Sequence, residues 1–255
     1  MVLQKKGVSW FRWTDARDKR YRRARTLWFF GFTLNNLLAL FYYFALKSLS
    51  PAVVGAMMGL NIVFSALFSA LLLGETLAKR TVGGSLVLIA CITVANLAAP
   101  GSDEGGIPSP AVIALFFAAP YALAAAAHAG RKILRLGGEY YALAFAAAAG
   151  ALEGFVIVLI RALRIRHGDD IAAYFLSPYL YMYLAASVSV IVFLQIAYSH
   201  GRISKTSPVL WSSQIIYPVA ISYVAFSVPL VPAQLAAFAG ILASVAVIQS
   251  KRYRS

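Results

Sequence analysis

The chain has 255 residues, of which 61% are hydrophobic and only 13% charged, and its mean hydropathy is +0.75. Because a soluble domain carries about 25% charged residues, this composition argues against a soluble enzyme and indicates an all-α polytopic membrane protein. The net charge of +14 would suit nucleic acid, but the basic residues flank apolar runs. Their placement favours contact with anionic lipid headgroups, and we expect no nucleic-acid partner.

Eight apolar runs are long enough, at about 20 residues each, to cross a bilayer as helices. A basic segment, residues 1–25, precedes the first of them. Several runs begin with proline, which suits a first helical turn because a missing N–H costs nothing there. In chain order the runs are Thr26–Leu46, Pro51–Leu73, Thr81–Ala99, Pro110–Gly130, Tyr140–Ala162, Tyr179–Ser199, Pro208–Val228 and Pro232–Gln249.

The lysines and arginines predict the orientation of these runs, since cytoplasmic loops carry an excess of them. With the amino terminus in the cytoplasm, most of the 23 fall on the cytoplasmic side. The loop 100–109 then lies outside and is acidic through Asp103 and Glu104. We therefore expect an integral multi-pass protein of a plasma or inner membrane with both termini cytoplasmic. The basic residues on the other side are Lys47, Arg161, Arg164 and Arg166.

One pattern occurs twice in the chain. Ser50-Pro51 matches Ser207-Pro208, and Gly83 matches Gly240, both at an offset of 157 residues. Under the predicted orientation the matched runs cross the membrane in opposite directions, which is the inverted repeat typical of secondary transporters. The pattern predicts a first repeat over residues 26–99, a connecting helix over 110–130 and a second repeat over 140–250.

These residues resemble the drug/metabolite transporter superfamily and its EamA-like members. The likeness rests on Ser-Pro at the start of the second run, Gly74-Glu75 at its end and Gly83 in the third run. Within the superfamily the chain is most similar to the NIPA-type magnesium transporters, through Gln4-Lys5-Lys6-Gly7 and Gln195-Ile196-Ala197-Tyr198. The resemblance implies a magnesium or related cation transporter.

The chain departs from the family pattern in two ways. The family's usual first helix has no counterpart among the predicted runs, so we expect the chain to be either a truncated or a reduced form. Val231-Pro232 also stands where the first repeat has Gly74-Glu75. The alternative to a transporter is therefore a non-transporting membrane scaffold or assembly subunit.

Glu153 is the main candidate for a functional residue. It lies near the middle of the run 140–162, between Gly150 and Gly154. A carboxyl group at that depth costs about 2.5–3.5 kcal/mol on insertion scales and commonly marks an ion or proton pathway. The small multidrug members of the superfamily also carry a membrane carboxylate in the first repeat helix. The alternative interpretation is that Glu153 only bonds a neighbouring helix.

Polar residues in other runs are further candidates for lining a substrate pathway, although each could equally join helices. Asn61 is distinguished because its repeat partner is Pro218, which should kink its helix near the midplane and face Asn61. The position of Glu75 at the end of the second run, beside Lys79, indicates that it orders the loop. The remaining candidates are Asn36, Ser65, Gln195, Gln214 and Tyr217.

The sequence predicts no cofactor and no enzyme, because no nucleophile–base spacing or metal-ligand cluster is present. Cys91 is the chain's one cysteine, and the three histidines lie far apart. A bare magnesium ion would need more carboxylates than Glu153 alone. A hydrated ion, or a second carboxylate from the partner chain of a homodimer, would answer that need. A small metabolite is the competing substrate class.

Overall fold

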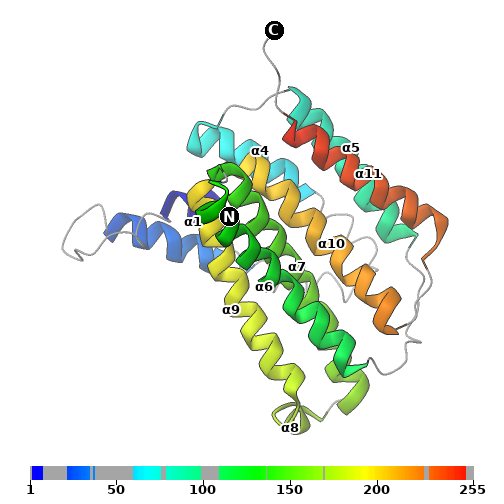
Figure 1. The fold of residues 1–255 in the computed structure, drawn as a ribbon. Coiled ribbons are helices and arrows are strands. Elements are labelled where there is room, and N and C mark those ends of the chain that lie inside the picture. Colours follow the sequence, from blue (N-terminus) through cyan, green and yellow to red (C-terminus); the bar gives the residue numbers. More distant parts are fainter. Residues whose placement is uncertain are drawn as a thin grey trace. The chain divides into compact units, whose positions relative to one another are not determined.

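The computed structural model describes residues 2–7, 22–34, 37, 60–75, 79–98, 109–135, 137–168, 170–226 and 230–250. Over these residues the ordered elements are helices, without strands. Residues 22–34 form one helical segment. The others are α1 (Val2–Gly7), α4 (Leu60–Leu73), α5 (Lys79–Leu97), α6 (Pro110–Ile133), α7 (Gly138–His167), α8 (Ile171–Tyr174), α9 (Pro178–His200), α10 (Ile203–Phe226) and α11 (Pro232–Gln249) (Figure 1).

Five of these helices, α5, α6, α7, α9 and α11, are long and apolar enough to span a membrane. The chain is therefore an all-α polytopic membrane protein. The second predicted run is described only in its later part, as α4. Helix α10, at 24 residues, also has the length to span and carries Ser212, Ser213 and Gln214 near its middle.

The boundaries of several helices differ from the predicted runs in ways that have local causes. Helix α7 continues past the predicted end at Ala162 to His167, so Arg164 and Arg166 lie in a helix and not in a loop. Helix α8 was not predicted, because its four residues are too few for a periodic pattern. Asp170 caps it by accepting hydrogen bonds from the backbone N–H groups of Ala172 and Ala173.

The chain divides into two compact units. Unit 1 comprises Met1–Ala99, Tyr198–Pro208 and Ala233–Ser255, and unit 2 comprises Pro100–Ala197 and Val209–Pro232. Units defined by packing thus differ from segments defined by the repeat, since α11 packs with the first-repeat helices. The repeat boundaries stay a prediction.

In unit 1, α5 and α11 lie side by side and run antiparallel (Figure 1). A Cβ atom on Gly84 would meet Ile248, while one on Gly240 would meet the Sγ atom of Cys91 at 2.5 Å. Two close approaches about two helical turns apart, each through a glycine, let the backbones pack tightly. A Cβ atom on Gly83, the glycine of the repeat pattern, would have nothing within 4 Å. The helix contact is therefore made by its neighbour Gly84.

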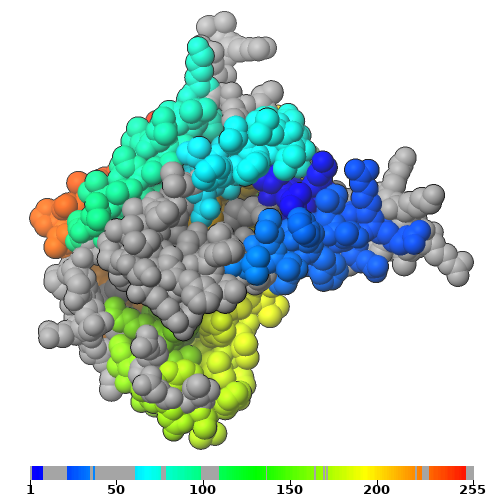
Figure 2. Space-filling view, turned by 180° about the vertical axis from the view of Figure 1, so that it is seen from behind, coloured from blue at the N-terminus to red at the C-terminus, as the bar shows by residue number. Residues whose placement is uncertain are grey.

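Also in unit 1, α1 packs against α4 and against the helical segment 22–34 (Figure 2). Gly7 lies so close to this segment that a Cβ would be 2.6 Å from the backbone nitrogen of Trp28. Gly31 approaches α1 at Gln4 in the same way. The two elements therefore join through glycine contacts.

In unit 2, α7 is the central helix. In its most apolar stretch 61% of residues are buried, against 22% for α6 and 17% for α9. Its fully buried side chains include Leu152, Phe155 and Leu159. Phe145 packs on Phe193 of α9 near one end, with ring centroids 5.2 Å apart. Leu159 and Tyr179 share a hydrophobic cluster near the other end, so α7 and α9 run antiparallel.

Candidate functional site

Two glycines set the crossing between α7 and α10 in unit 2. A Cβ atom on Gly150 would collide with the Leu210 carbonyl, and one on Gly154 would be 2.6 Å from the Gln214 carbonyl oxygen. Because 150 pairs with 210 and 154 with 214, the two helices run parallel. Their backbones touch over one helical turn through a small-xxx-small pattern. This crossing places Glu153 at the level of Gln214.

The Gln214 carbonyl at this crossing lacks its helical hydrogen bond. Its donor would be the N–H four residues later, and Pro218 has none. The ring of Pro218 lies against Gly154, where a Cβ would be 2.7 Å from its Cδ. Helix α10 nevertheless continues unbroken through Pro218 to Phe226. The Gln214 carbonyl therefore lacks an N–H partner at position 218 and packs against the backbone of Gly154, the residue after Glu153.

Glu153 itself has an enclosed carboxyl oxygen without a partner. Its Oε2 atom is buried and makes no hydrogen bond with the part of the chain that the structure describes. Gln214 is 7% exposed, and its buried Oε1 atom also makes no hydrogen bond with the described residues. Buried polar atoms are normally hydrogen-bonded, so these two oxygens on neighbouring helices are candidate binding groups for a proton, an ion or a polar substrate. Other buried side chains of the described residues, such as Ser85 and Trp211, also have such atoms.

Gln195 of α9 also has a buried Oε1 atom without a partner, but the fold places it elsewhere. It lies two residues after Phe193, which packs on Phe145 of α7. Phe145 precedes Glu153 by eight residues, or about 12 Å of helix. The structure therefore places Gly154, the residue after Glu153, against Gln214 and Pro218 and leaves Gln195 at a different level of the helices.

Tyr217 joins helices. Its hydroxyl donates a hydrogen bond to the carbonyl oxygen of Phe116 in α6, and the two rings meet edge to face at 5.7 Å. The Phe116 carbonyl is available because Pro120, four residues later, lacks the N–H that would otherwise bind it. Prolines in two helices thus each release one carbonyl at the α10 contacts. One is bound by Tyr217, and the other faces Gly154.

The remaining predicted residues lie in the first part of the chain. Asn61 and Ser65 are in α4, and Ser65 is buried. Asn36 falls outside the described residues. Asn61 belongs to unit 1 whereas Pro218 belongs to unit 2, so their predicted apposition stays a prediction. What the structure adds is the contact of Pro218 with α7.

Unit 1 contains a second polar cluster, built around Glu75 just after α4. Its Oε1 atom lies 2.5 Å from the Nζ atom of Lys5 and accepts a hydrogen bond from the Ile203 N–H at 3.1 Å. Its Oε2 atom accepts from the N–H and the hydroxyl of Ser204. Lys5 also donates to the carbonyl of Gly201 at 2.6 Å. The cluster joins α1, the end of α4 and the start of α10.

Electrostatics explain why a carboxylate sits there. Burial by itself would raise the pKa of Glu75, but the Lys5 ammonium and the N–H groups of Ser204 and Ile203 outweigh it and hold the pKa below its usual value. Ile203 and Ser204 open α10, so Glu75 satisfies two of its unpaired N–H groups at the positive end of the helix dipole. The sequence indicated a loop-ordering role for Glu75. It did not reveal Lys5 as the partner.

Groups of three or more residues able to hold a metal are absent from the described residues. Glu153 and Gln214 instead present oxygens suited to a proton or to a weakly held cation or polar substrate.

Comparison with known proteins relates the first part of the chain to a family. Residues 8–97 match the model of the EamA-like transporter family. No match was found among curated proteins or among solved structures. The matched segment covers less than half of the chain and lies within unit 1, whereas Glu153 lies in unit 2. Through residues 8–97, this polytopic membrane protein is similar to the EamA-like transporters of the drug/metabolite superfamily.

Proposed function

We propose that the protein is a secondary transporter of the drug/metabolite type that moves a cation or a small metabolite by alternating access, with Glu153 as its coupling residue. The observation that carries the proposal is the buried, unpartnered carboxyl oxygen of Glu153 beside the α7–α10 crossing. A buried acid in a membrane span is costly to keep unless it serves a pathway. The likeness of residues 8–97 to EamA-like transporters supports the same function.

The substrate class follows from the groups at hand. The candidate ligand atoms are the carboxyl oxygens of Glu153, the side-chain amide oxygen of Gln214 and the Gln214 backbone carbonyl oxygen. Such a set, with at most one negative charge, suits a monovalent cation, a proton or a polar organic molecule. Magnesium, which the NIPA-type likeness implies, holds its water tightly and prefers several carboxylates. It would therefore pass as a hydrated ion, or meet a second Glu153 from another copy of the chain.

Transport by purified protein in liposomes tests the proposal. We expect uptake of at least one member of a panel containing protons, magnesium, organic cations and small metabolites. Glu153→Gln should fold but lose most of this uptake, because the amide cannot release a proton. Glu153→Asp should retain uptake with a shifted pH dependence, because a shorter side chain changes the depth of the carboxyl group.

Glu139→Gln is the matched control, since it makes the same chemical change in the first turn of the same helix. It should transport like wild type. Wild-type uptake by Glu153→Gln at every pH would leave Glu153 as a structural residue. Absence of uptake by the wild-type protein across the whole panel would favour a scaffold over a transporter.

A further inference from the structure

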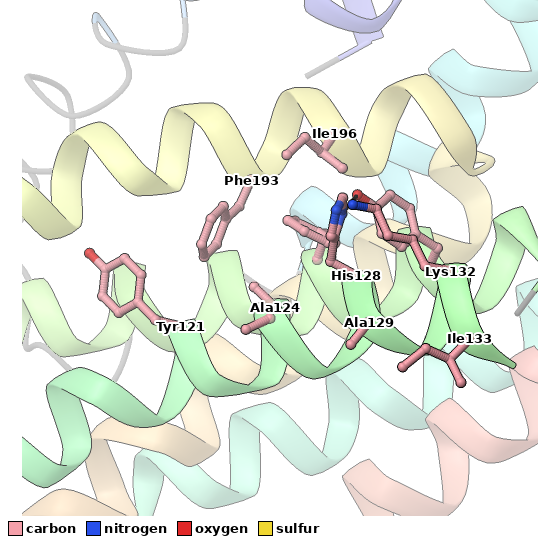
Figure 3. Close-up of a pocket in the computed structure, with 11 residues that line it drawn as sticks. Tyr121, Ala124, His128, Ala129, Lys132, Ile133, Phe193 and Ile196 are labelled. Carbon is pink, nitrogen blue, oxygen red and sulfur yellow. Dashed lines mark hydrogen bonds between the residues drawn. The ribbon is translucent and has the colours of Figure 1, made fainter.

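A groove of about 700 Å³ opens on unit 2 between α6 and α9, with α7 as its floor (Figure 3). Tyr141 and Phe145 of α7 are buried beneath it. Tyr121 and His128 of α6 and Phe193 of α9 point into it (Figure 3). All of its lining residues lie between Tyr121 and Ile196, within one unit.

Small side chains on α6 create the groove. Ala124, Ala125 and Ala129 line it, where larger residues would fill the space against α9. At its inner end the helices are joined, because the Tyr121 hydroxyl donates a hydrogen bond to Ser189 of α9 at 2.9 Å. Tyr121 also meets Phe193 edge to face at 5.8 Å. The groove is therefore closed at mid-helix and opens toward the end of α6.

The open end of the groove is basic, whereas the closed end is aromatic. Lys132 lines the open end and is exposed. Arg131 beside it has its guanidinium carbon 4.5 Å from the centre of the Tyr141 ring. His128 lies 3.4 Å from the Tyr141 hydroxyl. The acid on this stretch of sequence is Glu139, against Arg131, Lys132 and Arg135, so the end of α6 carries a net positive charge.

The length of the groove matches one leaflet of a bilayer. From Tyr121 to Ile133 is twelve residues of α6, or about 18 Å at 1.5 Å per residue. Half of the hydrocarbon core, which is about 30 Å thick, measures about 15 Å. A molecule with a charged head at Lys132 and an apolar chain reaching Tyr121 would thus lie in one leaflet.

We propose that this groove binds an anionic glycerophospholipid, with its phosphate at Lys132 and Arg131 and one acyl chain along the alanines of α6. The charge of the open end favours an anionic headgroup over a zwitterionic one, since each basic residue at a membrane surface contributes about 1 kcal/mol of attraction. Because the floor of the groove is apolar and α6 lies at the surface, the acyl chain would lie against the hydrocarbon core of the bilayer.

Native mass spectrometry of the full chain in detergent, titrated with phosphatidylglycerol or with phosphatidylcholine of the same acyl chains, tests the proposal. We expect tighter binding of phosphatidylglycerol. Lys132→Ala should weaken that binding about fivefold, as loss of one surface charge predicts. It should leave the binding of phosphatidylcholine unchanged. Lys79→Ala, an exposed lysine at the start of α5, is the matched control and should change binding less than twofold.

A second pair of variants tests the groove itself. Ala125→Phe should fill it and abolish the preference for phosphatidylglycerol, whereas Ala119→Phe, exposed on α6 outside the groove, should preserve it. Equal binding by Ala125→Phe and Ala119→Phe would overturn the proposal. Displacement of the lipid by glycerol phosphate would show a site for soluble anions instead. A change from dimer to monomer in Ala125→Phe alone would identify this face as an interface between copies.

Discussion

The Nζ atom of Lys5 lies 2.5 Å from the Oε1 atom of Glu75, although 70 residues separate them. Their side chains are 17% and 8% exposed. Because Glu75 also binds the first N–H groups of α10, this ion pair holds three separate elements of unit 1 at one point. An ion pair that is shielded from water and fully hydrogen-bonded is costly to break on one side only.

We predict that Glu75→Gln lowers the free energy of unfolding by about 1–3 kcal/mol, because Lys5 would lose its counter-charge in a part-buried setting. The effect depends on pH. Since the pKa of Glu75 is lowered in the folded state, its stabilisation is present above the ordinary value of 4.5 and is lost as the pH falls through the lowered value. Thermal unfolding in detergent should therefore show the wild-type advantage at pH 7 and its loss under strong acid.

The double variant Lys5→Met with Glu75→Gln provides the control for this prediction. It removes both charges, so it should be more stable than Glu75→Gln alone. Equal stability of the single and double variants would show that the two side chains do not act as a pair.

The neighbouring glycines of α5 should respond differently to alanine. At Gly84 a Cβ atom would lie 2.7 Å from Cγ1 of Ile248, so Gly84→Ala should destabilise unit 1 by about 1–3 kcal/mol through overpacking. At Gly83 nothing lies within 4 Å, and Gly83→Ala should stabilise the helix by about 0.5–1 kcal/mol. Denaturation of both variants in one detergent gives the comparison, and a reversed order would contradict the α5–α11 packing.

Restoring an N–H at position 218 should affect transport more than folding. Pro218→Ala would supply the donor missing from the Gln214 carbonyl, so we expect unchanged or higher thermal stability together with reduced uptake. Pro120→Ala makes the same change in α6, where the freed carbonyl is already bound by Tyr217. Liposome uptake measured on both variants should fall mainly for Pro218→Ala. Equal uptake by Pro218→Ala and wild type would remove that carbonyl from the pathway.

The orientation can be tested with reporters. A reporter active only in the cytoplasm should give signal when fused after Ser255 and none when inserted near Asp103, because the basic residues predict both termini inside. Signal at Asp103 and silence at Ser255 would reverse the orientation.

Much of the helical framework could be predicted from hydropathy and from the prolines and basic residues that flank the apolar runs. Pro232 begins α11 and Gln249 ends it, as expected from an apolar run bounded by proline and by basic residues. The same signals placed α6 with an error of a few residues. Helix α10 begins at Ile203, five residues before the predicted Pro208, because Glu75 caps it from another part of the chain.

The candidate site was predictable only in part. A lone acid in an apolar run stands out without any structure, which is why Glu153 was identified. Its relation to Gln214 depends on which faces of α7 and α10 meet. The sequence contains Gly150 and Gly154, but it does not tell which helix packs against them. The pairing of Lys5 with Glu75 is a contact of the same kind, with no local pattern to reveal it.

The pairing of α5 with α11 has a consequence for biosynthesis. Helix α11 leaves the ribosome long after α5, so the Gly84 surface of α5 must wait in the membrane without its partner while the helices between them are inserted. Unit 1, which holds the segment similar to EamA-like transporters, therefore completes its packing only after α11 is made. Loss of α11 should expose nascent α5 to membrane quality control, even though the missing helix lies at the other end of the sequence.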